Sequence, residues 1–113
     1  MQVRRVIPGQ LNVPVEDQPI YVISVAARLV GVHAQTLRYY ERIGLLEPAR
    51  SRGNVRLYST RDVQQVRRIK SLMDDLGINL AGVEVIMRMS LRIAELETKI
   101  QELAIKLGEV NSE

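Results

Sequence analysis

The 113-residue chain has no cysteine and only one histidine. The absence of cysteine excludes disulfide bonds, thiolate metal ligands and thiol redox sensing. A single histidine cannot form a zinc site by itself. We therefore expect neither a metal ion nor any other cofactor.

Long apolar runs are also missing from the sequence. No stretch approaches the roughly 18 consecutive apolar residues that a membrane-spanning helix needs, and the N-terminus lacks the apolar core of a signal peptide. We expect a cytoplasmic protein. The sequence also shows no carboxylate pair, nucleophile with a base, or phosphate-binding loop, so we do not expect an enzyme.

The basic and acidic residues are unevenly distributed, although the formal net charge is only +3. Residues 28–70 hold ten basic and three acidic residues, a net charge of +7. Residues 71–113 hold four basic and eight acidic residues, a net charge of −4. A basic segment of this size can release several counterions on binding DNA, so its affinity for DNA should fall steeply with salt.

The apolar spacing after Ser24 predicts two short helices. Ser24 is a suitable N-cap for the first helix, whose apolar face stops at Gly31. The second helix should begin near His33 and close at Gly44, with Leu37 and its helical neighbours facing inward. Two short helices joined by a glycine-containing turn indicate a helix-turn-helix, whose second helix enters the major groove.

The outward face of the second helix is polar and is the predicted reading surface. Gln35, Thr36, Arg38 and His33 are placed to reach base edges, and Arg42 should also contact DNA. The adjacent residues Tyr39 and Tyr40 point about 100° apart, so one should face a phosphate and the other the core.

A two-stranded wing is predicted after the second helix. Strand-like residues lie at 45–46 and at 55–58, on either side of a turn at residues 53–54. No acidic residue lies between Glu47 and Asp62 to neutralise the three arginines of this region, which are Arg50, Arg52 and Arg56. Guanidinium groups bind phosphate oxygens bidentately, so the wing should hold the DNA backbone.

Two scaffold helices are expected next. One should be capped by Ser59 or Thr60 and end near Leu76, and the other should be capped by Asn79 and span about residues 80–89. At the other end of the chain, residues 1–19 contain three of the four prolines and show no periodicity. That segment is expected to be a flexible or partly ordered arm.

The C-terminal segment has apolar residues at alternating spacings of three and four, the a/d pattern of a coiled coil. The pattern comprises Ile93, Leu96, Ile100, Leu103, Leu107 and Val110. Charged residues occupy the other faces, so a monomer would expose a continuous apolar stripe. The seam could be intramolecular, but the sequence offers no second long helix of matching length. A homodimer with two DNA-reading heads is therefore expected.

These motifs resemble a known protein family. The strings TLRYYERIGLL (36–46) and VRLYS (55–59), together with the closing helix, resemble the MerR family of winged-helix transcription regulators. Within that family, PIYVISVAARLVGVHAQTLR (19–38) and GINLAGVEVI (77–86) resemble the HspR group of heat-shock operon repressors. The similarity covers about residues 19–110.

The resemblance implies a mostly α fold, in which a winged helix-turn-helix DNA-binding domain is followed by a C-terminal coiled-coil dimerisation helix. The corresponding parts are the arm at residues 1–19, the DNA-binding domain at 20–90 and the dimerisation helix at 91–113. The dimer would be joined by an antiparallel coiled coil and would bind an inverted repeat. Arg56 and Tyr58 match the family's backbone-contacting pair.

The motifs and the resemblance together give a set of expected DNA-binding residues. The set is His33, Gln35, Thr36, Arg38, Tyr39, Arg42, Arg50, Arg52, Asn54, Arg56 and Tyr58. The resemblance also implies a repressor of chaperone genes in the bacterial nucleoid, with the chaperone DnaK as corepressor. No small-molecule effector is expected, because the chain ends a few residues after Val110 and lacks sensor cysteines.

Three alternatives remain open at this stage. The protein could be a MerR-type activator that distorts its promoter, because the fold serves both activation and repression. It could also be an excisionase-like architectural DNA-binding factor, which a stable monomer would favour. Temperature, finally, could be sensed through the chaperone or directly, by melting of the short coiled coil.

Overall fold

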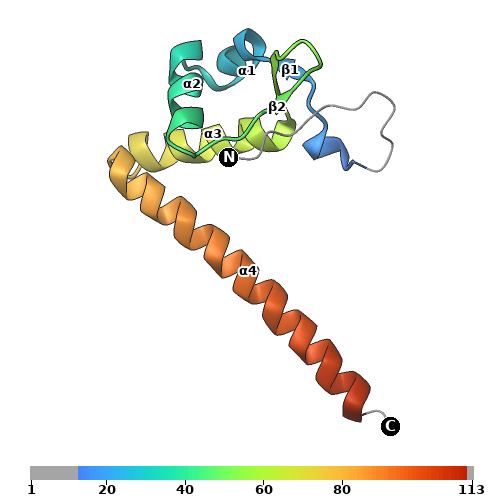
Figure 1. Cartoon of the computed structure of the whole chain (residues 1–113). Coiled ribbons are helices and arrows are strands. Elements are labelled where there is room, and N and C mark those ends of the chain that lie inside the picture. The colour runs from blue at the N-terminus through green and yellow to red at the C-terminus, as the bar shows by residue number, and fades with distance from the viewer. Residues whose placement is uncertain (1–12, 112–113) are drawn as a thin grey trace. The chain divides into compact units, whose positions relative to one another are not determined.

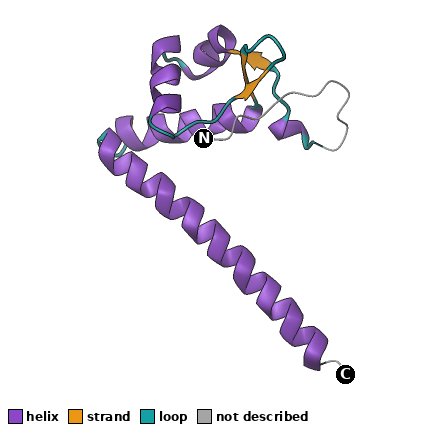
Figure 2. Ribbon diagram, in the orientation of Figure 1, coloured by secondary structure: helices purple, strands orange, loops and turns teal. Residues whose placement is uncertain are grey.

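The computed structural model describes residues 13–111, and its elements are shown in Figures 1 and 2. The chain divides into two compact units after Gly77. The first unit, here called the head, contains three helices and a small sheet, and the second contains one long helix. This is the predicted mostly helical fold. Residues 1–12 of the expected arm lie outside the described residues.

Helix α1 (Ile23–Val30) begins two residues earlier than the sequence suggested. Its N-cap is Val22, in an extended conformation and without a side-chain cap, so the expectation that Ser24 caps this helix is wrong. The reason is that the chain enters α1 directly from a strand whose pairing already fixes the backbone. The predicted end at Gly31 is confirmed, since Gly31 adopts a left-handed conformation with φ 72°.

Helix α2 (Ala34–Arg42) and helix α3 (Thr60–Asp74) complete the helical part of the head. Ser59 caps α3 through a reciprocal pair, in which Asp62 N donates to Ser59 Oγ (3.1 Å) and Ser59 N donates to Asp62 Oδ2 (2.9 Å). Leu37 of α2 and Ile69 of α3 are fully buried. Helix α1 packs against both α2 and α3, so the three helices enclose one apolar core.

The wing, defined here as residues 49–58, belongs to a three-stranded antiparallel sheet. Strands β1 (Tyr21–Val22), β2 (Ala49–Arg50) and β3 (Arg56–Tyr58) are ordered β1-β3-β2. The prediction of a strand at residues 45–46 is wrong, because Leu45 and Leu46 are buried core residues and the strand starts after Pro48. Strand β1 was not predicted.

Part of the expected arm is docked on the head. A short 3-10 turn at Val15–Asp17 contacts α3. Arg61 of α3 pairs with Asp17 and, at 3.6 Å, with Glu16. The backbone continues into β1, where Ile20 N donates to Tyr58 O at 3.1 Å. The last residues of the arm are therefore tied to the head.

Helix α4 (Leu80–Asn111) forms the second unit and is continuous over 32 residues, about 48 Å at 1.5 Å per residue. The expected separate helix at residues 80–89 is therefore wrong, because it and the coiled-coil segment form one helix. The predicted cap at Asn79 is confirmed, since Asn79 Oδ1 accepts a hydrogen bond from Gly82 N at 2.8 Å. Residues 112–113 lie outside the described part of the chain.

Candidate nucleic-acid interface

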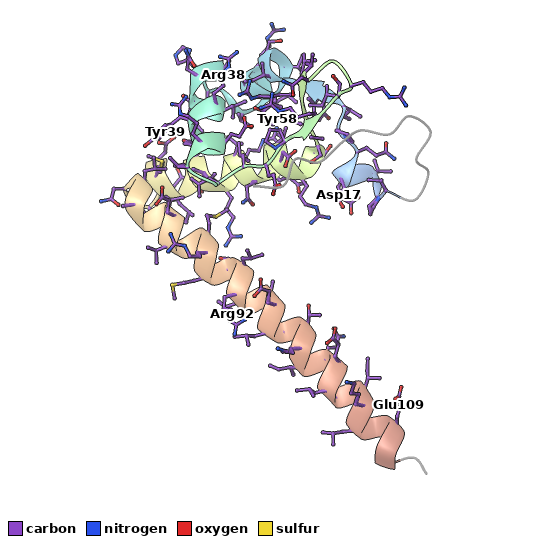
Figure 3. All side chains as sticks on the ribbon, viewed as in Figure 1. Asp17, Arg38, Tyr39, Tyr58, Arg92 and Glu109 are labelled. Carbon is purple, nitrogen blue, oxygen red and sulfur yellow. The ribbon has the colours of Figure 1, made fainter. Side chains whose placement is uncertain are left out.

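Helix α2 presents a polar face to solvent, as the sequence predicted. His33, Gln35, Tyr39 and Arg42 are exposed, and Thr36 and Arg38 are half-buried. Figure 3 shows Arg38 and Tyr39 projecting from this helix. The two adjacent tyrosines divide as expected, because the Tyr39 side chain is 42% exposed whereas Tyr40 is 7% exposed. Five polar or aromatic side chains of α2, together with His33 at its N-cap, are therefore at least partly accessible to solvent.

Contacts among these side chains restrain the face only weakly. The Arg42 guanidinium lies over the Tyr39 ring, 5.5 Å from the ring centroid, in a cation–π contact. The Arg38 Nη1 atom lies 3.5 Å from Gln35 Oε1, a long and weak hydrogen bond. Arg38 and Gln35 can therefore reorient to meet base edges at little energetic cost.

The tip of the wing is a tight, hydrogen-bonded loop. Ser51 N donates to Val55 O, Asn54 N donates to Ser51 O, both at 2.9 Å, and Val55 N donates to Ser51 Oγ at 3.1 Å. Asn54 adopts φ 62°, a left-handed conformation that asparagine tolerates better than most residues. This confirms the predicted turn. Arg52 and Asn54 are exposed at the tip.

The wing arginines are not all unneutralised, which corrects the sequence-based expectation. Glu41 of α2 is only 7% exposed. Its Oε1 atom accepts a hydrogen bond from Arg50 Nη2 at 2.9 Å, and its Oε2 atom accepts one from Arg56 Nε at 2.6 Å. The neutralising acid therefore comes from the preceding helix and lies outside the interval between Glu47 and Asp62.

Sequence reasoning missed Glu41, although the helical period contains a signal for it. Glu41 is four residues after Leu37 and one after Tyr40, so it lies on the buried face of α2. A charged residue on an apolar helix face needs a partner of opposite charge. The arginines that follow in the chain were the available partners.

Tyr58 is a core residue, which corrects its expected role at the DNA backbone. Its side chain is 1% exposed, and among the described residues its hydroxyl has no hydrogen-bond partner. Burial, reinforced by the negative charge of Glu41, raises the pKa of Tyr58 to about 12. Figure 3 shows Tyr58 inside the head, where a phosphate cannot reach its hydroxyl without rearrangement.

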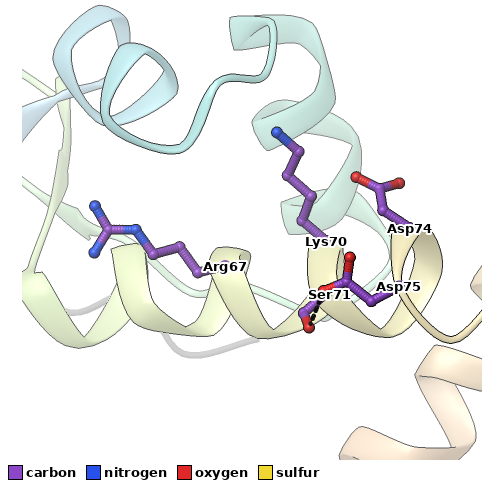
Figure 4. A pocket seen from close by; sticks show the side chains of 5 residues that line it. All are labelled: Arg67, Lys70, Ser71, Asp74 and Asp75. Atoms are coloured by element: carbon purple, nitrogen blue, oxygen red, sulfur yellow. Dashed lines mark hydrogen bonds between the residues drawn. The ribbon is translucent and has the colours of Figure 1, made fainter.

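Figure 4 shows a pocket over α3, and two of the basic residues that line it have a structural role. It is lined by Arg67, Lys70, Ser71, Asp74 and Asp75. Lys70 Nζ lies 3.2 Å from Val30 O, and Arg67 Nη2 lies 3.4 Å from Leu29 O. Both cations therefore satisfy carbonyl groups at the C-terminus of α1, where positive charge is favourable.

The apolar stripe of α4 is exposed. Five of its six predicted members are between 42% and 66% exposed, namely Ile93, Leu96, Ile100, Leu103 and Leu107. The Val110 side chain lies outside the described part of the structure. A long helix with such a stripe has the pattern of a coiled coil. Within residues 13–111, no helix is both long enough and apolar enough to cross a membrane.

Comparison with known proteins identifies the family. The model of the MerR HTH family regulatory proteins matches residues 21–90, which include α1, α2, the wing and α3. The chain belongs to the MerR family. Helices α1 and α2 and the wing described above therefore lie within the part of the chain that matches the MerR family.

Several curated MerR relatives are similar to this chain. A Streptomyces coelicolor protein that carries the name heat shock protein HspR is 48% identical over 107 residues, which cover 95% of this chain and 69% of that protein. The regulator GlnR of Bacillus anthracis is 38% identical over 63% of this chain and 54% of its own length. The mercuric resistance operon regulatory protein of Serratia marcescens is 40% identical over 59% and 46%, respectively. The chain thus spans about half of the latter two.

Solved MerR structures share the fold. The crystal structure of HiNmlR, a MerR family regulator lacking the sensor domain and bound to promoter DNA, matches with a TM-score of 0.57 and 22% identity over 80% of this chain and 75% of that chain. A MerR family regulator from Bacillus cereus matches with a TM-score of 0.50 and 29% identity over 77% and 73%. The fold and the family therefore agree.

Replacing Tyr58 by phenylalanine should leave stability at pH 7 unchanged or raise it by up to about 1 kcal/mol, because the lost hydroxyl has no partner among the described residues. The folded-state pKa of Tyr58, about 12, lies above its ordinary value of 10.0. Its contribution to stability is therefore complete below pH 10 and is lost as the pH rises toward 12. Tyr58→Phe should lose less stability than the wild type over that interval.

Urea unfolding at pH 7 and at several values above pH 10 measures both effects, with the exposed Tyr39→Phe as the control. An alkaline loss of stability in Tyr58→Phe equal to that of the wild type would contradict the assignment.

Proposed function

We propose that the protein is a homodimeric, sequence-specific DNA-binding repressor of heat-shock and chaperone genes. The observation that carries this proposal is the 48% identity, over 95% of the chain, to a protein named heat shock protein HspR. Membership of the MerR family supports DNA binding. The proposed target is an inverted repeat, which matches the two-fold symmetry of a dimer.

The proposed DNA contacts divide between two elements. Arg38, Gln35, Thr36 and His33 on the open face of α2 would read base edges, where arginine pairs with guanine and glutamine with adenine. Tyr39 and Arg42 on the same helix would contact phosphates, as would Arg52 and Asn54 at the wing tip. Arg50 and Arg56 would contact the DNA backbone only through the guanidinium N–H groups that do not donate to Glu41.

The exposed stripe of α4 supports the proposed dimer. Five apolar side chains lie along one seam of the helix, and leaving them in water is unfavourable by roughly 25 cal/mol per Å² of apolar surface. A second copy of the helix presents the same pattern and can cover them. The proposed dimer thereby carries two heads on one symmetry axis.

The proposed corepressor is the chaperone DnaK, and the proposed location is the nucleoid in the bacterial cytoplasm. The resemblance to the HspR group is the ground for proposing both. In this scheme, unfolded proteins withdraw the chaperone during heat shock and repression is relieved. The protein itself would act without catalysis and without a metal or small-molecule effector.

Footprinting tests the proposed function directly. The purified protein should protect an inverted repeat upstream of the chaperone operons in the genome that encodes it, and DnaK should strengthen this protection. Transcription in vitro from the same promoter should fall.

Protection of a different palindrome would contradict the heat-shock assignment but would still be consistent with a transcription regulator. Transcription that rises from a promoter with an overlong spacer would indicate the activator alternative. Repeating the binding across the heat-shock temperature range without DnaK tests direct thermal sensing.

Arg38 and Arg52 should affect DNA binding differently. Arg38→Ala should cost about 1 to 3 kcal/mol of operator binding and relax specificity at one base position, whereas Arg52→Ala should weaken binding to all sequences and reduce the salt slope by about one. Titrations on operator and random DNA at several salt concentrations separate the two effects. An equal loss on both DNAs for Arg38→Ala would remove its base-reading role.

A charge on the α4 seam should prevent dimerisation. Ile100→Asp should yield a monomer and lose most of the operator affinity, because a carboxylate cannot be buried in the seam. Ile105→Asp is the matched control, since Ile105 is also exposed on α4 but lies off the a/d pattern. Sedimentation equilibrium measures the mass of each variant. A dimer that persists in Ile100→Asp would place the interface elsewhere.

A further inference from the structure

The Glu41 carboxylate connects the reading helix to both strands of the wing. It is carried by α2, it is 7% exposed, and each of its two oxygens accepts a hydrogen bond from a different strand. Arg50 belongs to β2 and Arg56 to β3. One side chain therefore joins three elements of the head.

The two arginines are direct cross-strand neighbours. In the register of β2 and β3, Arg50 is paired with Arg56. Like charges in directly opposite positions destabilise a strand pair. The carboxylate of Glu41 compensates this repulsion, with distances of 2.9 Å to Arg50 and 2.6 Å to Arg56. Such charge-assisted hydrogen bonds are about twice as strong as neutral ones.

The connection continues to the tip of the wing. While its Nη2 atom binds Glu41, the Nη1 atom of Arg50 donates to Asn54 O at 3.3 Å. The loop closed by Ser51 and Val55 contains Asn54 and the exposed Arg52. The contacts that start at Glu41 on α2 therefore reach Asn54 in the loop that also carries Arg52.

We propose that Glu41 is a positioning residue for DNA recognition, which fixes the wing relative to the reading helix and withdraws Arg50 and Arg56 from indiscriminate phosphate binding. This inference rests on the proposed DNA-binding function. Its consequence is specificity. Two arginines held by a carboxylate can add to binding only in the register that α2 selects, whereas two released arginines would bind the phosphates of any sequence.

Simple electrostatics makes a different prediction. A carboxylate near DNA repels phosphates, so its removal would strengthen operator binding and random binding by the same factor. A purely structural role would lower the thermal stability and weaken both kinds of binding together. The proposed role separates operator affinity from random affinity, and neither alternative does so.

The decisive variant is Glu41→Gln, which keeps the size of the side chain and removes its charge. We expect operator affinity to fall at least about tenfold, while affinity for random DNA rises. The slope of log K against log salt on random DNA should steepen by up to about 1.8, since two additional phosphates at about 0.9 each would be contacted. Fluorescence anisotropy with operator and random duplexes measures all three quantities.

Two controls accompany this variant. Glu102→Gln removes one negative charge from an exposed site on α4 and should leave the ratio of operator to random affinity unchanged. The triple variant Glu41→Gln, Arg50→Gln, Arg56→Gln removes the released arginines, so its salt slope on random DNA should return to the wild-type value or below. Failure of this return would overturn the proposal.

The pKa of Tyr58 is sensitive to the charge of Glu41 and can be measured without DNA. The charge of Glu41 contributes to raising that pKa, so Glu41→Gln should shift the most alkaline tyrosine titration to lower pH. An ultraviolet titration of the DNA-free protein measures this shift. A shift to lower pH would support the position of Glu41 beside Tyr58 and the two wing arginines, while the ratio of operator to random affinity decides the proposal.

The remaining outcomes are distinguishable. Equal changes in operator and random affinity for Glu41→Gln would reject the positioning role while leaving the proposed function intact. A wild-type protein without any preferred DNA sequence would reject the proposed function itself. If Glu41→Gln does not fold, Arg56→Lys decides, because it keeps the charge but loses the planar guanidinium. An unchanged operator-to-random ratio in Arg56→Lys would then overturn the proposal.

Discussion

The arrangement of α2 and the wing depends on the two ion pairs of Glu41. The wing strands are two and three residues long, and an isolated ribbon of that length would not be stable. From α2, the carboxylate of Glu41 holds both strands. On its other side, β3 pairs with β1, the segment that leads into α1. The wing is therefore held by tertiary contacts with both helices of the reading motif, and its own turn sets only the conformation of the tip.

Those parts of the head that follow from local periodicity could be predicted from the sequence. Leu37 and Tyr40 recur at helical spacing, and both are buried. Periodicity places Glu41 on the buried face of α2, but it does not identify the partners of the carboxylate, which lie nine and fifteen residues further along the chain. The same limit applies to Tyr58, because a tyrosine suits a phosphate contact and a core site equally well. Strand β1 has two residues, which is too short for any alternation to show.

The errors at helix boundaries have a related cause. The apolar face of α4 changes between its first turns, where Val83 and Met87 are buried, and the exposed stripe that starts at Ile93. Two separate helices, at about residues 80–89 and from residue 91, were expected on the two sides of this change. A change of face marks a change of packing partner, and no proline or glycine between residues 83 and 107 interrupts the backbone hydrogen bonds. The helix α4 is therefore continuous across the change of apolar face.

The internal contacts of the basic residues limit how many phosphates one head can bind, and this limit bears on the proposed dimer. At least five of the ten basic residues between residues 28 and 70 are held by carboxylates or by backbone carbonyls, namely Arg50 and Arg56 by Glu41, Arg61 by Asp17, and Arg67 and Lys70 by carbonyls at the end of α1. The net charge of +7 thus overstates the number of phosphates that one head can hold, since each internal contact occupies donors or fixes a cation in place.

Arg38 and Arg42 on α2 and Arg52 at the wing tip remain for the proposed contacts with DNA. Few phosphate contacts on one head would give weak DNA binding, and in the proposed dimer joining two heads would raise affinity through effective concentration without any new contact. In the proposed dimer, operator affinity therefore depends on the exposed stripe of α4 as well as on the reading helix.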